Sequence, residues 1–134
     1  MNFFRLSEQM SNAAYTAIVL DEPSKALLLS HFPSPEGWEK ICHHMTINMG
    51  SADKGPAANL LGQKVHMTVT SLAQDDKVMA VGVETTVPSS NARKHVTIAV
   101  NRSAGGKPFH SNLLSNWQAT KPMVISGTVM EVGR

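Results

Sequence analysis

Two short motifs hold the residues whose types and spacing could do chemistry. The chain contains HMTI at residues 44–47 and HVTI at residues 95–98, each within a run of β-forming residues. In both motifs a histidine and a threonine stand two positions apart, and side chains with that spacing on a strand point to the same face. If the two strands lie side by side, one cleft receives two imidazoles that can move protons and two hydroxyls that can hold an anion. The pair of motifs therefore predicts a site that cleaves phosphodiesters.

The candidate catalytic residues are His44 and His95. An unperturbed histidine has a pKa of about 6.5, so near neutral pH one imidazole can be neutral while its partner is protonated. The neutral ring would take a proton from water or a ribose hydroxyl, and the charged ring would give one to the departing oxygen. We expect Thr46 and Thr97 to hold the non-bridging phosphate oxygens, where negative charge accumulates. The sequence leaves the assignment of acid and base open.

Two further histidines compete with this pair. The motif HMTV at residues 66–69 has the same pattern, but it lies within a predicted hairpin and no glycine-containing loop follows it, so we expect His66 to face outward. His43 directly precedes His44, and neighbouring side chains on a strand point to opposite faces. We therefore expect His43 to lie behind the cleft.

Two peripheral residues are candidates for substrate binding. Lys107 follows Gly105 and Gly106 and could meet a phosphate, although the same residues fit an ordinary turn. Tyr15 could stack on a base, or it could be a core aromatic residue with its hydroxyl at the surface.

Length and composition predict a small, single-domain protein. The chain has 134 residues and a net charge of +2, so a nucleic-acid partner would bind at a small site and not along a broad basic surface. Residues 14–134 are expected to form one domain, with residues 1–13 as an N-terminal arm or short helix. Cys42 is the single cysteine and is expected to be a buried strand thiol. We expect a cytoplasmic protein, in the host cytoplasm if the source is viral, because no apolar run has membrane-spanning length.

The motifs need strands to position them, and the rest of the chain predicts these elements. We expect an α+β domain with about six mostly antiparallel strands and one or two helices. A helix should begin after Asp21, with Asp21 or Ser24 as its cap. Glycine-containing loops after the two motifs, at residues 50–56 and 102–108, are expected to border the site. The expected strands cover residues 14–20, 41–49, 65–72, 77–87, 94–101 and 123–132.

The paired motifs resemble those of the two-histidine phosphoesterase superfamily. The longer phrases GWE at residues 37–39, HHMTINMG at residues 43–50 and HVTIAVN at residues 95–101 are similar to its Swiss Army Knife branch, which is linked to RNA repair. The resemblance implies a bilobal fold with two antiparallel sheets, a few outer helices and a central cleft. It also implies His44 and His95 as the catalytic pair and Thr46 and Thr97 as phosphate ligands, with no metal or cofactor.

The leading hypothesis is a metal-independent phosphodiesterase that hydrolyses a 2′,3′-cyclic phosphate of a nucleotide or RNA end. A second hypothesis uses the same chemistry. It is the cleavage of cyclic oligonucleotide defence signals, as in phage enzymes of the superfamily that evade anti-phage defence. A module that binds nucleotide or RNA without catalysis is a third hypothesis. A histidine-rich metal site is a fourth, but no histidine has a partner at a ligand spacing such as four residues along a helix. The oligomeric state stays open.

Overall fold

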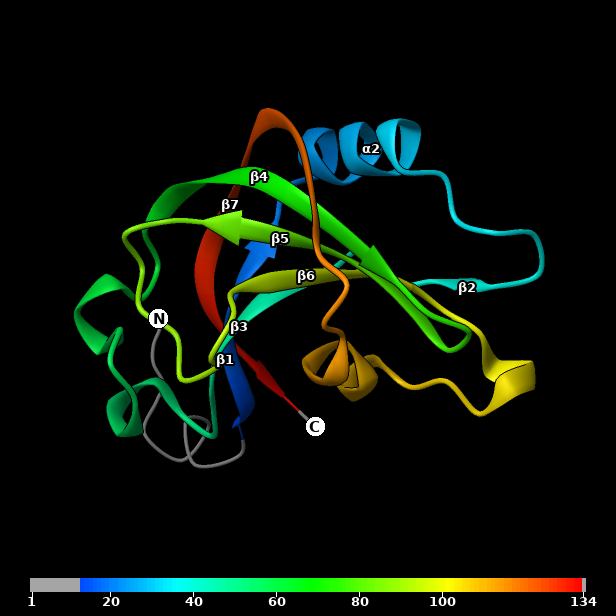
Figure 1. The fold of residues 1–134 in the computed structure, drawn as a ribbon. Coiled ribbons are helices and arrows are strands. Elements are labelled where there is room, and N and C mark those ends of the chain that lie inside the picture. Colours follow the sequence, from blue (N-terminus) through cyan, green and yellow to red (C-terminus); the bar gives the residue numbers. More distant parts are fainter. Residues whose placement is uncertain (1–12, 134) are drawn as a thin grey trace.

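The strands of this protein join into one antiparallel sheet that closes on itself (Figure 1). The structure is a computed structural model, and it describes residues 13–133. The expected N-terminal arm therefore falls almost entirely outside the described residues. The strands are β1 (Ala13–Leu20), β2 (Glu39–Lys40), β3 (His44–Met49), β4 (Lys64–Gln74), β5 (Val78–Glu84), β6 (His95–Val100) and β7 (Gln118–Gly133). The helices are α2 (Glu22–His31) and the short 3₁₀ helices η2 (Ala52–Lys54), η3 (Ala58–Leu60), η4 (Arg102–Ala104) and η5 (Pro108–Leu113).

The sheet has seven strands in the order β2-β6-β3-β1-β7-β4-β5, and β5 also pairs with β6. That last pairing closes every strand except the short β2 into a barrel of six strands. The domain is mostly sheet with few helices, which agrees broadly with the expected α+β class. The finer expectation of two sheets in two lobes is not confirmed, because the described strands form a single sheet.

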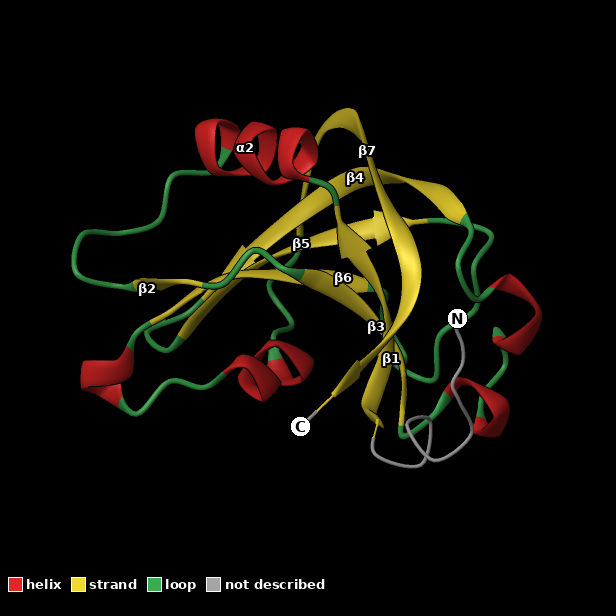
Figure 2. Ribbon diagram, turned by 180° about the vertical axis from the view of Figure 1, so that it is seen from behind, coloured by secondary structure: helices red, strands yellow, loops and turns green. Residues whose placement is uncertain are grey.

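The long strand β7 explains why the sheet is continuous. It has 16 residues, more than the expected 123–132. Its first part pairs with β4 from Gln118 to Thr128, and its last part pairs with β1 from Gly127 to Gly133. One bent strand therefore joins the two parts of the fold that the sequence led us to expect as separate lobes (Figure 2).

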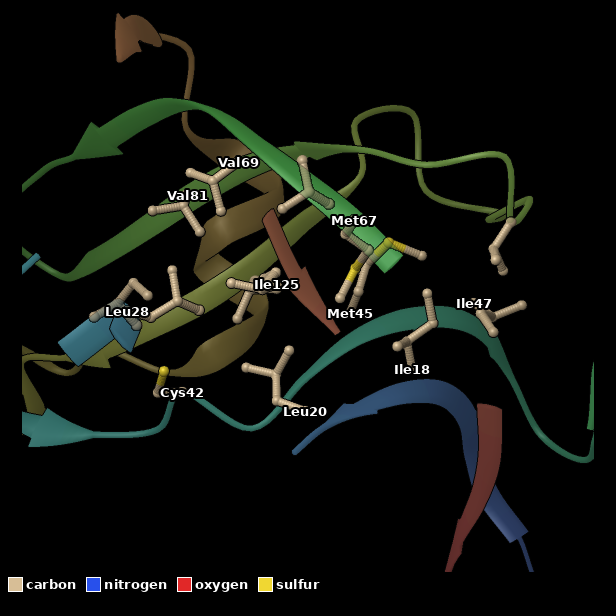
Figure 3. Packing of buried hydrophobic residues seen from close by; sticks show 14 of the residues in the cluster. Ile18, Leu20, Leu28, Cys42, Met45, Ile47, Met67, Val69, Val81 and Ile125 are labelled. Atoms are coloured by element: carbon tan, nitrogen blue, oxygen red, sulfur yellow. The ribbon is translucent and has the colours of Figure 1, made fainter. Parts of the chain in front are cut away.

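Alternation along the strands fills the inside of the barrel with apolar side chains. Met45 and Val96, which lie between the histidine and the threonine of each motif, are fully buried. Ile47 and Ile98, which follow the threonines, are fully buried too. Other core residues come from β1, β4, β5 and β7, including Ile18, Met67, Val69, Val81 and Ile125 (Figure 3). Because neighbouring side chains alternate, the histidines and threonines of the two motifs face the outside of the barrel wall.

The helix α2 begins where the sequence predicts. The Asp21 side chain accepts a hydrogen bond from the Ser24 N–H at 2.9 Å, and Pro23 stands in the first turn. Leu28 is fully buried and joins the barrel core. With ten residues, α2 is the longest helix of the described part of the chain, and no helix there is long and apolar enough to cross a membrane.

A second, smaller apolar cluster lies outside the barrel. It combines outward side chains of β4, β5 and β6, namely Ala73, Val78, Ala80 and Val100, with Leu114, and Trp117 packs against it. The segment that contains η5 therefore covers part of the outer face of β5 and β6 and provides a wall next to the second motif.

Candidate active site

The two motifs meet at the centre of their strands. The only registered pair of β3 and β6 is Met45 with Val96, which are the middle residues of the two motifs. Two antiparallel strands are related by a local two-fold axis through such a pair. That axis relates His44 to His95 and Thr46 to Thr97, and it places all four on the outer face.

One cleft collects these four residues. It has a volume of about 280 Å³. Both histidines and both threonines line it, together with Ile41, Met49, Asn91, Pro108, Phe109 and Asn112. The structure therefore brings together the two predicted catalytic residues and the two predicted phosphate ligands from positions 51 residues apart in each case, His44 to His95 and Thr46 to Thr97.

Strands β3 and β6 share a single registered pair. Beyond that point the segment that precedes β6 bonds to β3 instead. The Ser90 N–H donates to the Ile47 carbonyl at 2.7 Å, and the Ser89 hydroxyl donates to the Thr46 carbonyl at 2.8 Å. This segment carries Asn91 into the cleft. Neither the loop of residues 50–56 nor the 102–107 part of the second predicted loop supplies a lining residue, so the two glycine-containing loops border the cleft less than expected.

His44 has two side chains beside its Nδ1 atom. His43 Nδ1 lies 3.0 Å away, and the Tyr15 hydroxyl lies 3.5 Å away. The Tyr15 and His44 rings also stack, with their centroids 4.6 Å apart. Burial lowers the pKa of His44 to about 4, and repulsion from His43 and then His95 adds to that shift. His44 is therefore neutral at neutral pH.

The expectation that His43 lies on the opposite side from His44 is wrong. Strand β3 begins only at His44, and Cys42 just before it has a φ of 40°. This left-handed residue interrupts the alternation of side chains, since alternation requires extended backbone. The chain turns at Cys42, and the His43 ring comes to lie against the His44 ring.

Cys42 itself is buried, as expected. Its side chain is 0% exposed, and burial raises the pKa of its thiol to about 11. A thiol in that state is not a nucleophile.

His95 is held differently. Its Nδ1–H donates to the Arg93 carbonyl at 2.8 Å, which leaves Nε2 as the nitrogen available for proton transfer. Burial lowers the pKa of His95, while the bond to the Arg93 carbonyl opposes that shift because it favours the charged ring.

Thr97 is paired with a buried serine, Ser111. The Thr97 and Ser111 hydroxyl oxygens are 2.7 Å apart, and Ser111 is 2% exposed. One of the two hydroxyls donates to the other, and the bond fixes where the Thr97 oxygen lies.

Of the remaining predicted residues, Tyr15 lies at the site and Lys107 and His66 do not. Tyr15 lies against His44, so it is at the site, but as a neighbour of the histidine ring and not as a lining residue of the cleft. Lys107 is exposed and does not line the cleft, although the next residue, Pro108, does. His66 is exposed on β4, as expected.

Sequence reasoning missed Asn91, Phe109 and Asn112 as lining residues. Asn91 lies in the irregular segment before β6, Phe109 and Asn112 lie on the short helix η5, and their approach to the cleft depends on tertiary packing. Within residues 13–133, no group of three or more histidine, cysteine or acidic side chains is arranged to hold a metal ion.

A comparison with protein families agrees with this geometry. The family model described as the fungal tRNA ligase phosphodiesterase domain matches residues 28–132, which is most of the chain and includes both motifs. No curated protein matches the chain. The family is one of two-histidine phosphoesterases, so the coarse activity is that of a phosphodiesterase, a hydrolase. The chain therefore belongs to the fungal tRNA ligase phosphodiesterase domain family, within the two-histidine phosphoesterase superfamily.

Proposed function

We propose that this protein hydrolyses a 2′,3′-cyclic phosphate at an RNA end by general acid and base catalysis between His44 and His95, without a metal ion. The observation that carries the proposal is the single cleft that both His-x-Thr motifs line, with the motifs related by the local axis at Met45 and Val96. Membership of a tRNA ligase phosphodiesterase family supports an RNA end over a cyclic oligonucleotide as the substrate.

The unlike surroundings of the two histidines support an assignment of roles. His44, with a pKa of about 4, is the neutral ring and therefore the base. It takes a proton from a water molecule as the water oxygen attacks phosphorus. His95 keeps the Arg93 carbonyl as a partner that favours its charged form, so it is the acid. Its Nε2 gives a proton to the ribose oxygen as the P–O bond breaks, and the product is a phosphomonoester.

The threonines act on the phosphate itself. Negative charge grows on the non-bridging oxygens in the transition state, and hydroxyl donors placed there stabilise it more than they stabilise the substrate. Thr46 and Thr97 both line the cleft, and Ser111 holds the Thr97 hydroxyl in place.

The test is hydrolysis of a short RNA that ends in a 2′,3′-cyclic phosphate, in the presence of a chelator. The wild-type protein should convert it to a phosphomonoester. His44→Ala and His95→Ala should each lower kcat by about 10²- to 10⁴-fold, the usual contribution of one proton transfer. His66→Ala is the matched control, since it removes a histidine of the same pattern from an exposed position, and it should leave the rate unchanged.

Full activity of the His44→Ala or His95→Ala protein would exclude this site. Loss of activity with chelator, restored by added metal, would contradict the metal-independent mechanism. Tight nucleotide binding without turnover of any cyclic phosphate would instead favour a recognition module.

A further inference from the structure

A second cavity opens directly beside the catalytic cleft. It has a volume of about 400 Å³. It shares three lining residues with the cleft: Asn91, His95 and Asn112. The two cavities are therefore adjacent, and His95 stands at their border. The reaction proposed above takes place in the cleft, and of the residues that line the second cavity it uses only His95 and Ser111.

Arg93 supplies the positive charge of this second cavity. Its guanidinium carbon lies 4.7 Å from the centroid of the Trp117 ring, in a cation–π contact. The Trp117 ring is itself held, because its Nε1–H donates to the Leu114 carbonyl at 3.1 Å. Within residues 13–133 the only ion pair joins Arg102 to Glu39, so no described carboxylate neutralises Arg93. The guanidinium is therefore held against the indole ring, and no carboxylate among residues 13–133 pairs with its N–H groups, which can bind an anion.

The contacts of Gly82 show where the Arg93 guanidinium lies relative to His95. Gly82 on β5 is the registered partner of His95 on β6. A Cβ atom added at Gly82 would lie 3.4 Å from Arg93 Nη1. The guanidinium thus lies over the strand that pairs with the strand of His95.

We infer that the second cavity binds the phosphate on the 5′ side of the terminal nucleotide, with the Arg93 guanidinium as its ligand. The inference rests on the proposed function, because it assumes that the terminal cyclic phosphate occupies the cleft. Arginine suits this task because its planar donors match a phosphate and hold it with charge-assisted hydrogen bonds. The amide of Asn112 and the hydroxyl of Ser90 line the same cavity and can donate to the same group. The enzyme therefore prefers cyclic ends that carry a phosphate on the 5′ side to cyclic mononucleotides without one.

The test compares three substrates that share one terminal cyclic phosphate. They are a 2′,3′-cyclic mononucleotide with a free 5′ hydroxyl, the same nucleotide with a 5′ phosphate, and a dinucleotide with a 2′,3′-cyclic end. The wild-type protein should show kcat/KM about 5- to 20-fold higher for the second and third substrates than for the first, mainly through KM. Arg93→Gln should remove that gain, so that the three substrates react with similar kcat/KM. Arg93→Lys should restore part of it.

Arg102→Gln is the matched control. It removes the same charge from an exposed arginine that lines neither cavity, and all three substrates should react as with the wild-type protein. An equal loss on all three substrates in Arg93→Gln would overturn the proposal, because Arg93 would then act only through its contact with His95. A 5′ phosphate gain that survives Arg93→Gln would overturn it too.

A binding measurement separates this proposal from the catalytic one. Mononucleotides that carry a 2′ or a 3′ phosphate are titrated with and without a 5′ phosphate, and tryptophan fluorescence or heat is the signal. If no cyclic phosphate is hydrolysed but the 5′ phosphate still tightens binding in an Arg93-dependent way, the subsite stands and the proposed catalysis falls. If the 5′ phosphate brings no gain in affinity, the subsite falls whatever the rates show.

Discussion

At the scale of single residues, the two catalytic candidates share a motif but not an environment. His44 lies against two polar rings, His43 and Tyr15, and is strongly biased toward the neutral form. His95 lies against a backbone carbonyl, which accepts from its ring and so favours the proton. The difference between these neighbours supports separate roles for two residues that the sequence makes equivalent.

The first prediction concerns the pH profile of kcat/KM, which reports groups of the free enzyme. Activity should rise as His44 loses its proton, near pH 4, and fall as His95 loses its proton. Since the pKa of His95 lies below its usual 6.5, the fall should begin below that pH. The maximum is expected between about pH 4 and pH 6.5. A maximum above pH 8, measured with a cyclic phosphate substrate, would contradict the assignment of roles.

The second prediction concerns His43, whose repulsion is one cause of the low pKa of His44. His43→Asn removes that repulsion and should raise the pKa of His44, which moves the rising limb of the profile to higher pH. The readout is the position of this limb, which a purely structural role of His43 would not move. His31→Asn, on the exposed end of α2, is the control and should leave the limb in place.

At the scale of elements, local sequence signals predicted most of the strands and the helix α2. Asp21 caps α2 as expected, and the hairpin of β4 and β5 turns where Asp75 accepts the N–H groups of Lys77 and Val78. These features depend on side chains that bond to their own backbone a few residues away, so the sequence is enough to predict them.

The errors occur where the backbone departs from the rule without a local signal. The expected strand of residues 41–49 is broken at Cys42, whose φ of 40° is rare for a residue other than glycine or asparagine. The predicted orientation of the His43 side chain was therefore wrong. Asn91 lies in the segment that precedes β6 and Asn112 lies on η5, and no periodic pattern marks either as a lining residue.

The third prediction tests the close approach of β7 to β1. A Cβ atom at Gly127 would lie 2.3 Å from the Val19 carbonyl oxygen, which is backbone and cannot rotate away. Gly127→Ala should lower the free energy of unfolding by about 1 to 3 kcal/mol, as overpacking does. Gly133→Ala is the control on the same strand, because a Cβ there meets nothing within 4 Å. Denaturant unfolding measures both, and equal stability of the two variants would contradict the clash.

At the scale of the whole molecule, the two faces of the closed sheet differ: one packs the core and the other carries the candidate catalytic residues. The inner face of β3 and β6 carries fully buried apolar side chains, while the outer face of the same strands carries the histidines and threonines. A sequence pattern with period two predicts these two faces, but it does not predict whether six strands form one closed sheet or two open ones. That outcome depends on the bend of β7, which pairs with both β4 and β1.

The fourth prediction is a loss of stability in mild acid. The pKa of His44 is about 4 in the folded protein and near 6.5 in the unfolded chain, so the unfolded state binds more protons between these values. The free energy of unfolding should therefore be highest above pH 6.5 and fall toward pH 4, by on the order of 1 to 3 kcal/mol. Urea unfolding at several pH values measures this.

Substitution of the histidine isolates its part of the effect. His44→Asn should reduce the decline between pH 6.5 and pH 4, and the part that stays is expected from His95, whose pKa is also lowered by burial. Asp21, whose pKa is lowered by its bonds to Ser126 and Ser24, loses its stabilising effect only as the pH falls below about 3.8, so the two windows are separate. A decline of the same slope in the His44→Asn protein would show that other groups cause it.

The local axis at Met45 and Val96 has a consequence for how a substrate enters. A pair of motifs related by two-fold symmetry presents the same face to a strand read in either direction, so the motifs alone carry no polarity. The direction of a bound strand must come from the residues around the motifs, which differ. The Tyr15 and His43 rings lie beside His44, whereas Arg93 lies on the Trp117 ring near His95. The unlike residues around this symmetric pair of motifs therefore determine in which direction an RNA strand lies in the cleft.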